Sequence, residues 1–273
     1  MVAAAAAALF ALSTTLQALE ARHAPAEEAL QSSLLVRLLR NKTWLLGGAC
    51  GVGGWGLQAA ALALGSVAIV QPALGLGLVT QLFLGRRMLG EHVGRREAYG
   101  VATVIVGVAL LAWAAPSGID HFTRSGRVAV AAAGAILAAA PHALRLAGFG
   151  GGLATSVLAG LGWAWVGLGT ALVDRGLAHG DLLAALPWAA GVGLVTWTSL
   201  VIEMSAFQKW PATRSFPLIF GLEMALPPAV APLLTHGGVG PAHGAPFAIA
   251  LVVTLAGATA LGSSRRVAAV QSL

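Results

Sequence analysis

The feature that most constrains the fold is a series of nine stretches in which almost every residue is apolar. Most of them are close to the ~20 residues that an α-helix needs to cross about 30 Å of hydrocarbon. They cover roughly residues 2–19, 43–63, 67–85, 98–115, 127–141, 152–173, 185–205, 215–235 and 246–263. We therefore predict an all-α polytopic membrane protein with nine transmembrane helices.

The composition excludes a water-soluble fold. The chain of 273 residues is 58% hydrophobic and 10% charged, whereas a soluble domain has about 45–50% apolar and about 25% charged residues. This charge is too small to cover the surface of a soluble core. A net charge of +6 is often a sign of nucleic-acid binding, but here the basic residues lie in short gaps between apolar stretches. We therefore expect no nucleic-acid partner.

The Lys and Arg residues are unevenly distributed between the two sides of the predicted membrane. When successive gaps are assigned to alternate sides, thirteen lie on one side and three on the other. The positive-inside rule places the larger group in the cytoplasm. We therefore predict a multi-pass plasma-membrane protein with its N-terminus outside and its C-terminus cytoplasmic. The thirteen are Arg22, Arg37, Arg40, Lys42, Arg86, Arg87, Arg95, Arg96, Arg145, Lys209, Arg214, Arg265 and Arg266, and the three are Arg124, Arg127 and Arg175.

The second half of the chain repeats the stretch at 55–91. A shift of 145 residues aligns the two copies without a gap, which places the second predicted helix on the seventh. Five crossings separate these helices, so the two copies have opposite orientation, as in the inverted repeats of secondary transporters. We predict one membrane domain with a first repeat of four helices (1–116) and a second of five (127–266). The aligned pairs are Gln58 and Glu203, Ala61 and Ala206, and Pro72 and Pro217, and a further slip of five residues aligns Gly107 with Gly257.

The first gap, residues 21–42, is predicted to form an amphipathic element on the cytoplasmic side. Pro25, Glu27 and Glu28 are typical of a helix start, and four leucines follow at helical spacing. Two interpretations remain open: a short helix lying on an anionic leaflet, or a solvated linker. The leucines are Leu30, Leu34, Leu35 and Leu38.

Two acidic side chains lie inside the predicted helices, where a charge costs about 2.5–3.5 kcal/mol at the helix centre. Glu223 lies about eight residues into its stretch, among prolines that free backbone carbonyl groups. Glu203 lies near the cytoplasmic end of the seventh stretch, with Thr196 and Ser199 on the same helical face. Each acid either lines a cavity and binds a cation or proton, or is structural. In the structural case, Glu223 forms a hydrogen bond to a neighbouring helix, and Glu203 stays hydrated at the membrane–water interface.

Four further residues are candidates for a substrate pathway. Gln58 and Gln71 lie toward the outer side of the predicted membrane, where they either bind substrate or join helices by hydrogen bonds. Trp55 and Trp197 lie near the polar helix faces, where they either line a pocket or anchor and pack the helices. No catalytic Ser/His/Asp or Cys/His set shares a depth, and the histidines lack metal-ligand spacing. We therefore expect no enzymatic activity, no metal site and no cofactor.

The run from Trp44 to Leu111 resembles one half of a drug/metabolite transporter of the EamA type. Such proteins commonly have ten helices in two inverted halves of five, and the four-plus-five arrangement expected here is closer to the magnesium-transporter-like (NIPA-type) branch. The pair Gly90-Glu91 is replaced by Thr235-His236 in the second half. The resemblance rests on Trp44 after basic residues, the run LQAAAL, a helix with Pro72, Gly90-Glu91 before a basic loop, and Gly100 and Gly107 in the last helix.

These features predict a secondary transporter that moves a small metabolite, a drug-like molecule or a cation by alternating access. One alternative, which the resemblance implies, is a Mg²⁺ transporter of the NIPA type. The other is a non-transporting membrane protein that binds lipid or organises partners, which the scarcity of buried charge favours. The expected partners are the substrate, the lipid bilayer and a second copy of the chain in a homodimer.

Overall fold

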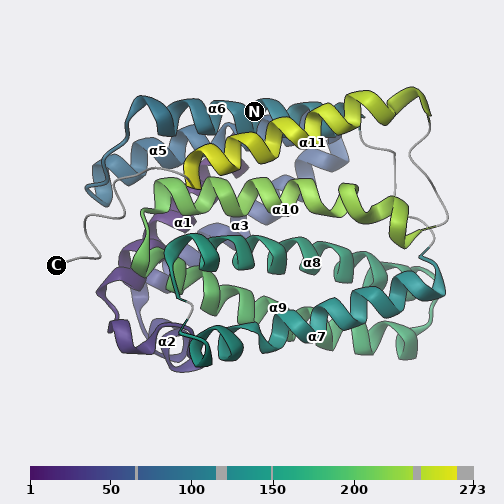
Figure 1. Cartoon of the computed structure of the whole chain (residues 1–273), viewed down its shortest axis with the longest axis horizontal. Coiled ribbons are helices and arrows are strands. Elements are labelled where there is room, and N and C mark those ends of the chain that lie inside the picture. The colour runs from purple at the N-terminus through teal and green to yellow at the C-terminus, as the bar shows by residue number, and fades with distance from the viewer. Residues whose placement is uncertain (65–66, 115–121, 149, 236–240, 263–273) are drawn as a thin grey trace.

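A computed structural model describes residues 1–64, 67–114, 122–148, 150–235 and 241–262, which are almost entirely helical and contain no strand (Figure 1). The predicted all-α class is confirmed. The helices are α1 (Val2–His23), α2 (Ser32–Leu38), α3 (Lys42–Leu64), α4 (Val67–Gly75), α5 (Gly77–Met88), α6 (Arg95–Ala114), α7 (Arg124–Leu146), α8 (Gly152–Ala178), α9 (Leu182–Lys209), α10 (Ala212–Leu234) and α11 (Pro241–Gly262), with one short 3-10 helix, η1 (Ala26–Glu28).

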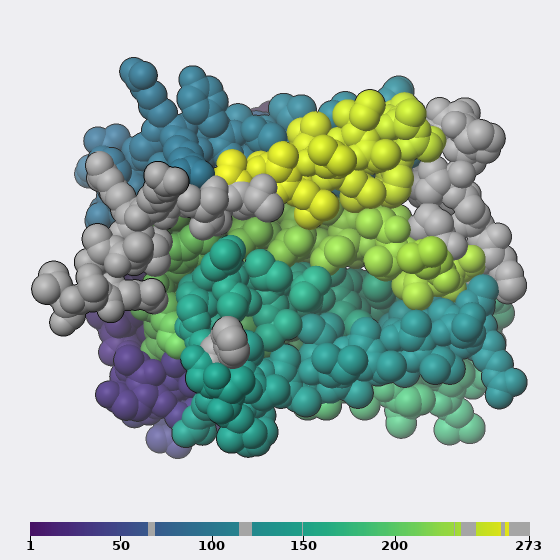
Figure 2. Space-filling view, viewed as in Figure 1, coloured from purple at the N-terminus to yellow at the C-terminus, as the bar shows by residue number. Residues whose placement is uncertain are grey.

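The described helices are those of a membrane protein. Six of them, α1, α3, α6, α7, α8 and α9, are long and apolar enough to cross a bilayer. Large apolar side chains also cover the outer surface, and Leu64 and Leu183 expose 80% and 86% of their surface. Such extended apolar exposure is not tolerated in water. Figure 2 shows one outer face, formed by side chains of α7, α8, α10 and α11. The remaining predicted crossings coincide with α4–α5, α10 and α11, which fall outside this group of six.

The third apolar stretch forms two helices rather than one. The α-helical run is interrupted at Leu76, between Gly75 and Gly77. Pro72 has no N–H, so it removes one bond from the preceding turn. Gly77 also allows α1 to approach closely, because a Cβ atom there would lie 2.8 Å from the carbonyl oxygen of Ala7. The interruption therefore coincides with two glycines of low helix propensity and with a close contact between α5 and α1.

Helices α6 and α11 cross at a close contact. Backbone lies against backbone here: a Cβ atom on Gly107 would lie 2.6 Å from the amide nitrogen of Thr254, and one on Gly257 would lie 3.0 Å from the carbonyl oxygen of Gly100. Because Gly100 meets Gly257 while Gly107 meets Thr254, the two helices run antiparallel. Small residues at a crossing permit such an approach between membrane helices.

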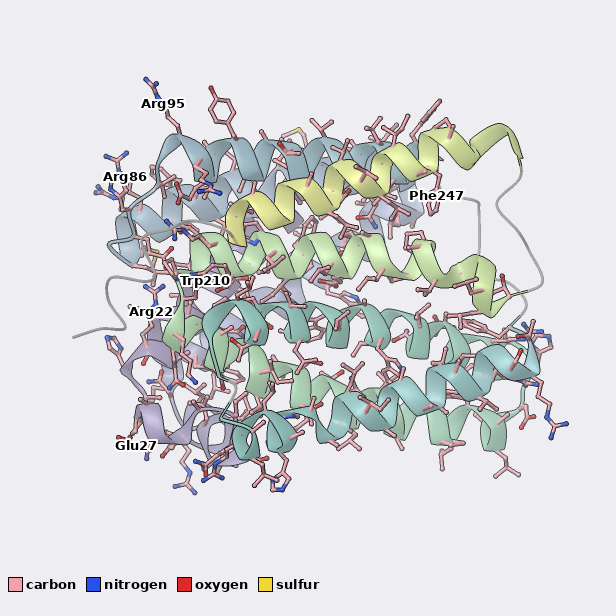
Figure 3. The ribbon with its side chains drawn as sticks, in the orientation of Figure 1. Arg22, Glu27, Arg86, Arg95, Trp210 and Phe247 are labelled. Carbon is pink, nitrogen blue, oxygen red and sulfur yellow. The ribbon has the colours of Figure 1, made fainter. Side chains whose placement is uncertain are left out.

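The basic residues gather at one end of the bundle. Figure 3 shows Arg22, Arg86 and Arg95 at this end and Phe247 toward the other. We call it the basic end, and it also contains Lys209 at the end of α9 and Arg214 near the start of α10. At the opposite end the start of α7 meets the end of α10, where the amide nitrogen of Thr123 donates to the carbonyl oxygen of Leu234 at 2.9 Å. The predicted positions Arg265 and Arg266 lie outside the described residues.

The loop at 21–42 contains the short helices η1 and α2. Leu30, Leu34, Leu35 and Leu38 are all buried, and they pack in one cluster with residues of α9 such as Ile202. The apolar face of this amphipathic element therefore covers α9 and is not free to lie on a leaflet. On its outer side Arg37 donates to both carboxylate oxygens of Glu28, at 2.9 and 2.8 Å, which lowers the pKa of the Glu28 carboxyl from its ordinary value.

Candidate functional site

A cavity of about 940 Å³ lies between the helices of the two halves. Its walls come from α1, α3, α4 and α5 on one side and from α8, α9 and α10 on the other. Ligand pockets are typically concave, largely apolar and about 300–1,000 Å³ in volume. Of the six residues predicted to line a substrate pathway, five line this cavity: Glu203, Glu223, Gln58, Gln71 and Trp55.

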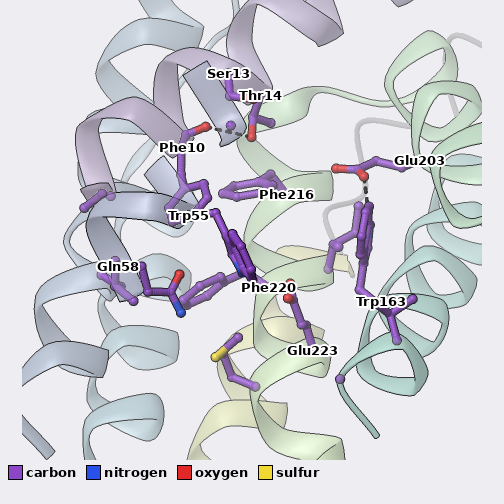
Figure 4. A pocket seen from close by; sticks show the side chains of 18 of the residues that line it. Phe10, Ser13, Thr14, Trp55, Gln58, Trp163, Glu203, Phe216, Phe220 and Glu223 are labelled. Carbon is purple, nitrogen blue, oxygen red and sulfur yellow. Dashed lines mark hydrogen bonds between the residues drawn. The ribbon is translucent and has the colours of Figure 1, made fainter. Parts of the chain in front are cut away.

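Glu203 is buried in the wall and held in place by a tryptophan. Only 6% of its surface is exposed, and its Oε2 accepts a hydrogen bond of 2.8 Å from Nε1 of Trp163 on α8. Figure 4 shows this pair on one side of the cavity, with Gln58 on the opposite side and Phe216 and Phe220 between them. Of the two interpretations open from sequence, the structure therefore favours a cavity-lining acid over one that water covers at the interface.

Glu223 lies near the middle of α10 and also faces the cavity. It forms no hydrogen bond or ion pair with any residue in the described part of the chain, so the hydrogen-bonded structural alternative has no partner there. Pro227 and Pro228 follow four and five residues later and line the same cavity. Because proline has no N–H, the carbonyl groups of Glu223 and Met224 lose their usual helical donors. The helix continues through these prolines to Leu234.

The predicted glutamines and tryptophans differ in their surroundings. Gln58 and Gln71 are half-buried in the wall, and the Oε1 atom of Gln71 is buried without a hydrogen-bond partner among the described residues. Trp55 lies in the wall with 68% of its surface exposed. Trp197 does not line the cavity: its Nε1 donates to Oγ of Ser32 at 3.4 Å, which joins α9 to α2.

Sequence reasoning missed several residues of the wall. Phe10, Phe216 and Phe220 line it in addition to Trp163, and the rings of Phe216 and Phe220 are tilted by 36° with centroids 6.3 Å apart. An aromatic residue in an apolar stretch can lie in a cavity wall or in the packed core, and the sequence does not distinguish the two positions. Asp174 was placed beyond the sixth stretch, but α8 continues to Ala178 and brings it to the cavity.

The basic end is closed by a buried cluster centred on Glu91. This carboxylate forms an ion pair with Arg22 of α1 and accepts hydrogen bonds from the amide nitrogens of Ala212 and Thr213, at 2.6 and 2.7 Å. Those two amides belong to the first turn of α10 and have no partners within the helix. The negative charge also lies at the positive end of the helix dipole. Glu91 therefore joins α1, the end of α5 and the start of α10.

A second buried ion pair lies beside the first. Arg214 on α10 donates to Oε1 of Glu97 on α6 at 2.6 Å from Nη2 and 3.0 Å from Nε. Glu97 also accepts from the amide nitrogen of Gly94 at 2.9 Å. None of these charged residues lines the cavity. The cavity is thus separated from the basic end by two ion pairs.

The comparisons with known proteins identify no relative. No family model matches the chain, and no curated protein and no solved structure matches it. Within the described ranges no group of three or more His, Cys, Asp or Glu side chains is arranged to hold a metal ion. The fold and the site define an all-α membrane protein with a large cavity lined by two carboxyl groups, of which Glu203 is buried and Glu223 half-buried.

Proposed function

We propose that this protein is a secondary transporter that moves a small molecule or ion through the cavity by alternating access. The observation that carries the proposal is the position of Glu203 and Glu223 in one cavity between the two halves of the chain. An ionisable residue inside a membrane domain is costly and is typical of a substrate or proton pathway. A carboxylate that only stabilised the fold would need a paired cation, and no Lys or Arg is among the described residues of the wall.

The proposed architecture has nine crossings in two inverted repeats of four and five helices. The predicted counterparts run in opposite directions: α6 and α11 are antiparallel, and Trp44 at the start of α3 donates to Met204 near the end of α9. Likewise Gly85 near the end of α5 meets Thr213 at the start of α10. The packing also repeats, because α1 packs on α3 and α5 as α8 packs on α9 and α10. These observations support an inverted repeat with a central site.

The proposed orientation places the basic end in the cytoplasm of a plasma-membrane protein. The wall reaches Asp174, an exposed residue near the end of α8 that lies away from the basic end. With the ion pairs of Arg22 and Arg214 closing the other end, this arrangement corresponds to an outward-facing state. The opposite state requires those ion pairs to separate while the outer end closes.

The experiment that tests the proposal is a flux assay in proteoliposomes over a panel of metabolites, amines and metal cations. We expect saturable flux for at least one class, and we expect Glu223→Gln to reduce it at least tenfold because Gln keeps the shape but has no charge to bind a cation or proton. Glu27→Gln, which alters an exposed acid on η1, should retain flux. Size-exclusion chromatography would check that each variant is folded.

One outcome would narrow this proposal to an ion, and two others would contradict it. Flux of Mg²⁺ alone would favour the NIPA-type alternative, in which the two carboxylates hold a partly hydrated ion. No flux of any class would favour a non-transporting membrane protein. Wild-type flux in a well-folded Glu223→Gln variant would show that Glu223 is structural and would remove the observation on which the proposal rests.

A further inference from the structure

The charges of the wall are all of one sign. Its acidic residues are Asp174, Glu203 and Glu223, and the described wall contains no Lys, Arg or His. The nearby basic residues Arg22 and Arg214 are already bonded to Glu91 and Glu97 at the basic end. An anionic ligand would therefore meet repulsion without any compensating group, so the cavity selects against anions.

The carboxyl groups of Glu203 and Glu223 have unused acceptor capacity. Trp163 donates to one oxygen of Glu203, and no hydrogen bond from a described residue reaches Glu223. Both carboxyl groups face the same cavity (Figure 4). Gln71 Oε1, which has no hydrogen-bond partner among the described residues, adds a further acceptor. What is missing from this cavity is a group that donates hydrogen bonds and carries positive charge.

The remainder of the wall fits an organic body rather than a bare ion. Aromatic side chains line it from four helices: Phe10 of α1, Trp55 of α3, Trp163 of α8, and Phe216 and Phe220 of α10. Aromatic faces attract cations, more strongly where water is excluded, and they also pack against apolar groups. Mg²⁺ instead requires about six oxygen atoms in octahedral geometry at 2.0–2.1 Å, which these apolar walls do not supply.

We propose that the cavity binds an organic cation, in which an ammonium group lies between Glu203 and Glu223 and an aromatic or apolar body packs against Trp55, Phe216 and Phe220. This inference rests on the proposed function, because it names the class of substrate that the transporter takes. It differs from a proton-only or metal-ion site in requiring both the charge and the body of the ligand.

The test uses three probes of nearly equal size on the full-length protein in nanodiscs. Phenethylammonium, which carries three N–H donors, is the cation, propylbenzene is its uncharged isostere, and 3-phenylpropanoate is an anion of similar shape. Isothermal titration calorimetry, corrected with empty nanodiscs, should give saturable binding for the cation at least tenfold tighter than for the other two. Mg²⁺ at equal ionic strength should not displace it. Equal binding of the uncharged isostere, or displacement by Mg²⁺, would overturn the inference without requiring any variant.

Variants locate the binding within the cavity. Glu203→Gln and Glu223→Gln should each weaken cation binding at least tenfold, while Glu27→Gln should leave it unchanged. Wild-type affinity in both of the first two variants would place the cation elsewhere and overturn the inference. The result also separates the two proposals: cation binding without flux would contradict transport but support the site, whereas flux of another substrate class without cation binding would support transport and reject the organic cation.

Discussion

The hydrogen bond between Trp163 and Glu203 is the interaction that fixes the orientation of a carboxyl group in the cavity. Both partners come from helices that pack closely, since Ser199, one turn before Glu203, lies against Gly162. The indole therefore donates from a fixed position. A hydrogen bond to a charged group contributes about 1.5–3 kcal/mol, so this bond is a substantial part of what holds Glu203 in the wall.

We expect Trp163→Phe and Glu203→Leu to be coupled in a double-mutant cycle. Each substitution removes the Trp163–Glu203 bond, so the double variant should lose less stability than the sum of the two single losses, with a coupling of about 1.5–3 kcal/mol. Thermal unfolding in detergent would measure it. Trp113→Phe is the control, because Trp113 is exposed on α6 and does not line the cavity. Additive losses would show that the hydrogen bond contributes no stability.

The sequence alone predicted several polar residues of the cavity wall but not the residues that bond to them. Gln58, Gln71, Glu203 and Glu223 were identifiable because a polar group in an apolar stretch is costly and therefore rarely incidental. Trp163 was not, because tryptophan is apolar enough to belong to any membrane helix, and only the packing of α8 on α9 places its N–H beside a carboxyl group. For the same reason the sequence did not decide whether Trp197 lines a pocket or packs between helices, and in the structure it joins α9 to α2.

The junction between α5 and α10 explains the Gly90-Glu91 pair. Gly90 has a φ of 64°, a left-handed conformation that glycine adopts at little cost, and the amide nitrogen of Glu91 bonds back to Gly85 at 3.1 Å. This turn ends α5 and directs the Glu91 side chain to the first turn of α10. The sequence did not show the role of this pair, because the partners of Glu91 are distant in the chain: Arg22 lies 69 positions before it, and Ala212 and Thr213 lie 121 and 122 positions after it.

Substitution of Glu91 should destabilise the protein strongly. Glu91→Gln leaves the Arg22 guanidinium without its anion and weakens the cap on α10, and breaking a buried pair in this way costs about 3–5 kcal/mol. We expect a clear fall in melting temperature in detergent, with Glu27→Gln as the exposed control. An unchanged melting temperature would mean that water solvates Arg22 and Glu91 adequately at the basic end.

For the whole molecule, the charge distribution predicts the orientation in the membrane. Reporter fusions should place the N-terminus outside and the C-terminus in the cytoplasm, because the basic end contains most of the described Lys and Arg residues. Reversing the charge bias, by moving arginines from 86–87 to the opposite end, should reduce the fraction with this orientation. Both termini on the same side would require an even number of crossings and would contradict the nine-helix arrangement.

Over the described residues most helix positions were predictable, apart from the division of the third stretch into α4 and α5, whereas the way the halves meet was not. Apolar length fixed the positions of the helices to within a few residues, because few other structures satisfy the backbone in lipid. The alignment of Gly107 with Gly257 showed a repeated glycine but not that both glycines lie in one crossing, since a repeat in sequence does not state which copies touch.

That crossing should be sensitive to a single methyl group. Gly107→Ala would place a Cβ atom 2.7 Å from the Cα atom of Thr254, so the helices must separate, and we expect a loss of about 1–3 kcal/mol in thermal unfolding. Gly56→Ala is the matched control, because a Cβ atom there has no neighbour within 4 Å and alanine favours the helix by up to about 1 kcal/mol. Equal melting temperatures would show that the α6–α11 contact is loose.

The same contact has a mechanical consequence. Backbone meets backbone at Gly100, Gly107 and Gly257, so α6 and α11 hold the two halves of the chain together at one close contact. In a rotation of the two halves about this contact, the displacement of each helix grows with its distance from the contact. Helices α8 and α9, which are far from the glycine contact, are then displaced furthest by a small rotation.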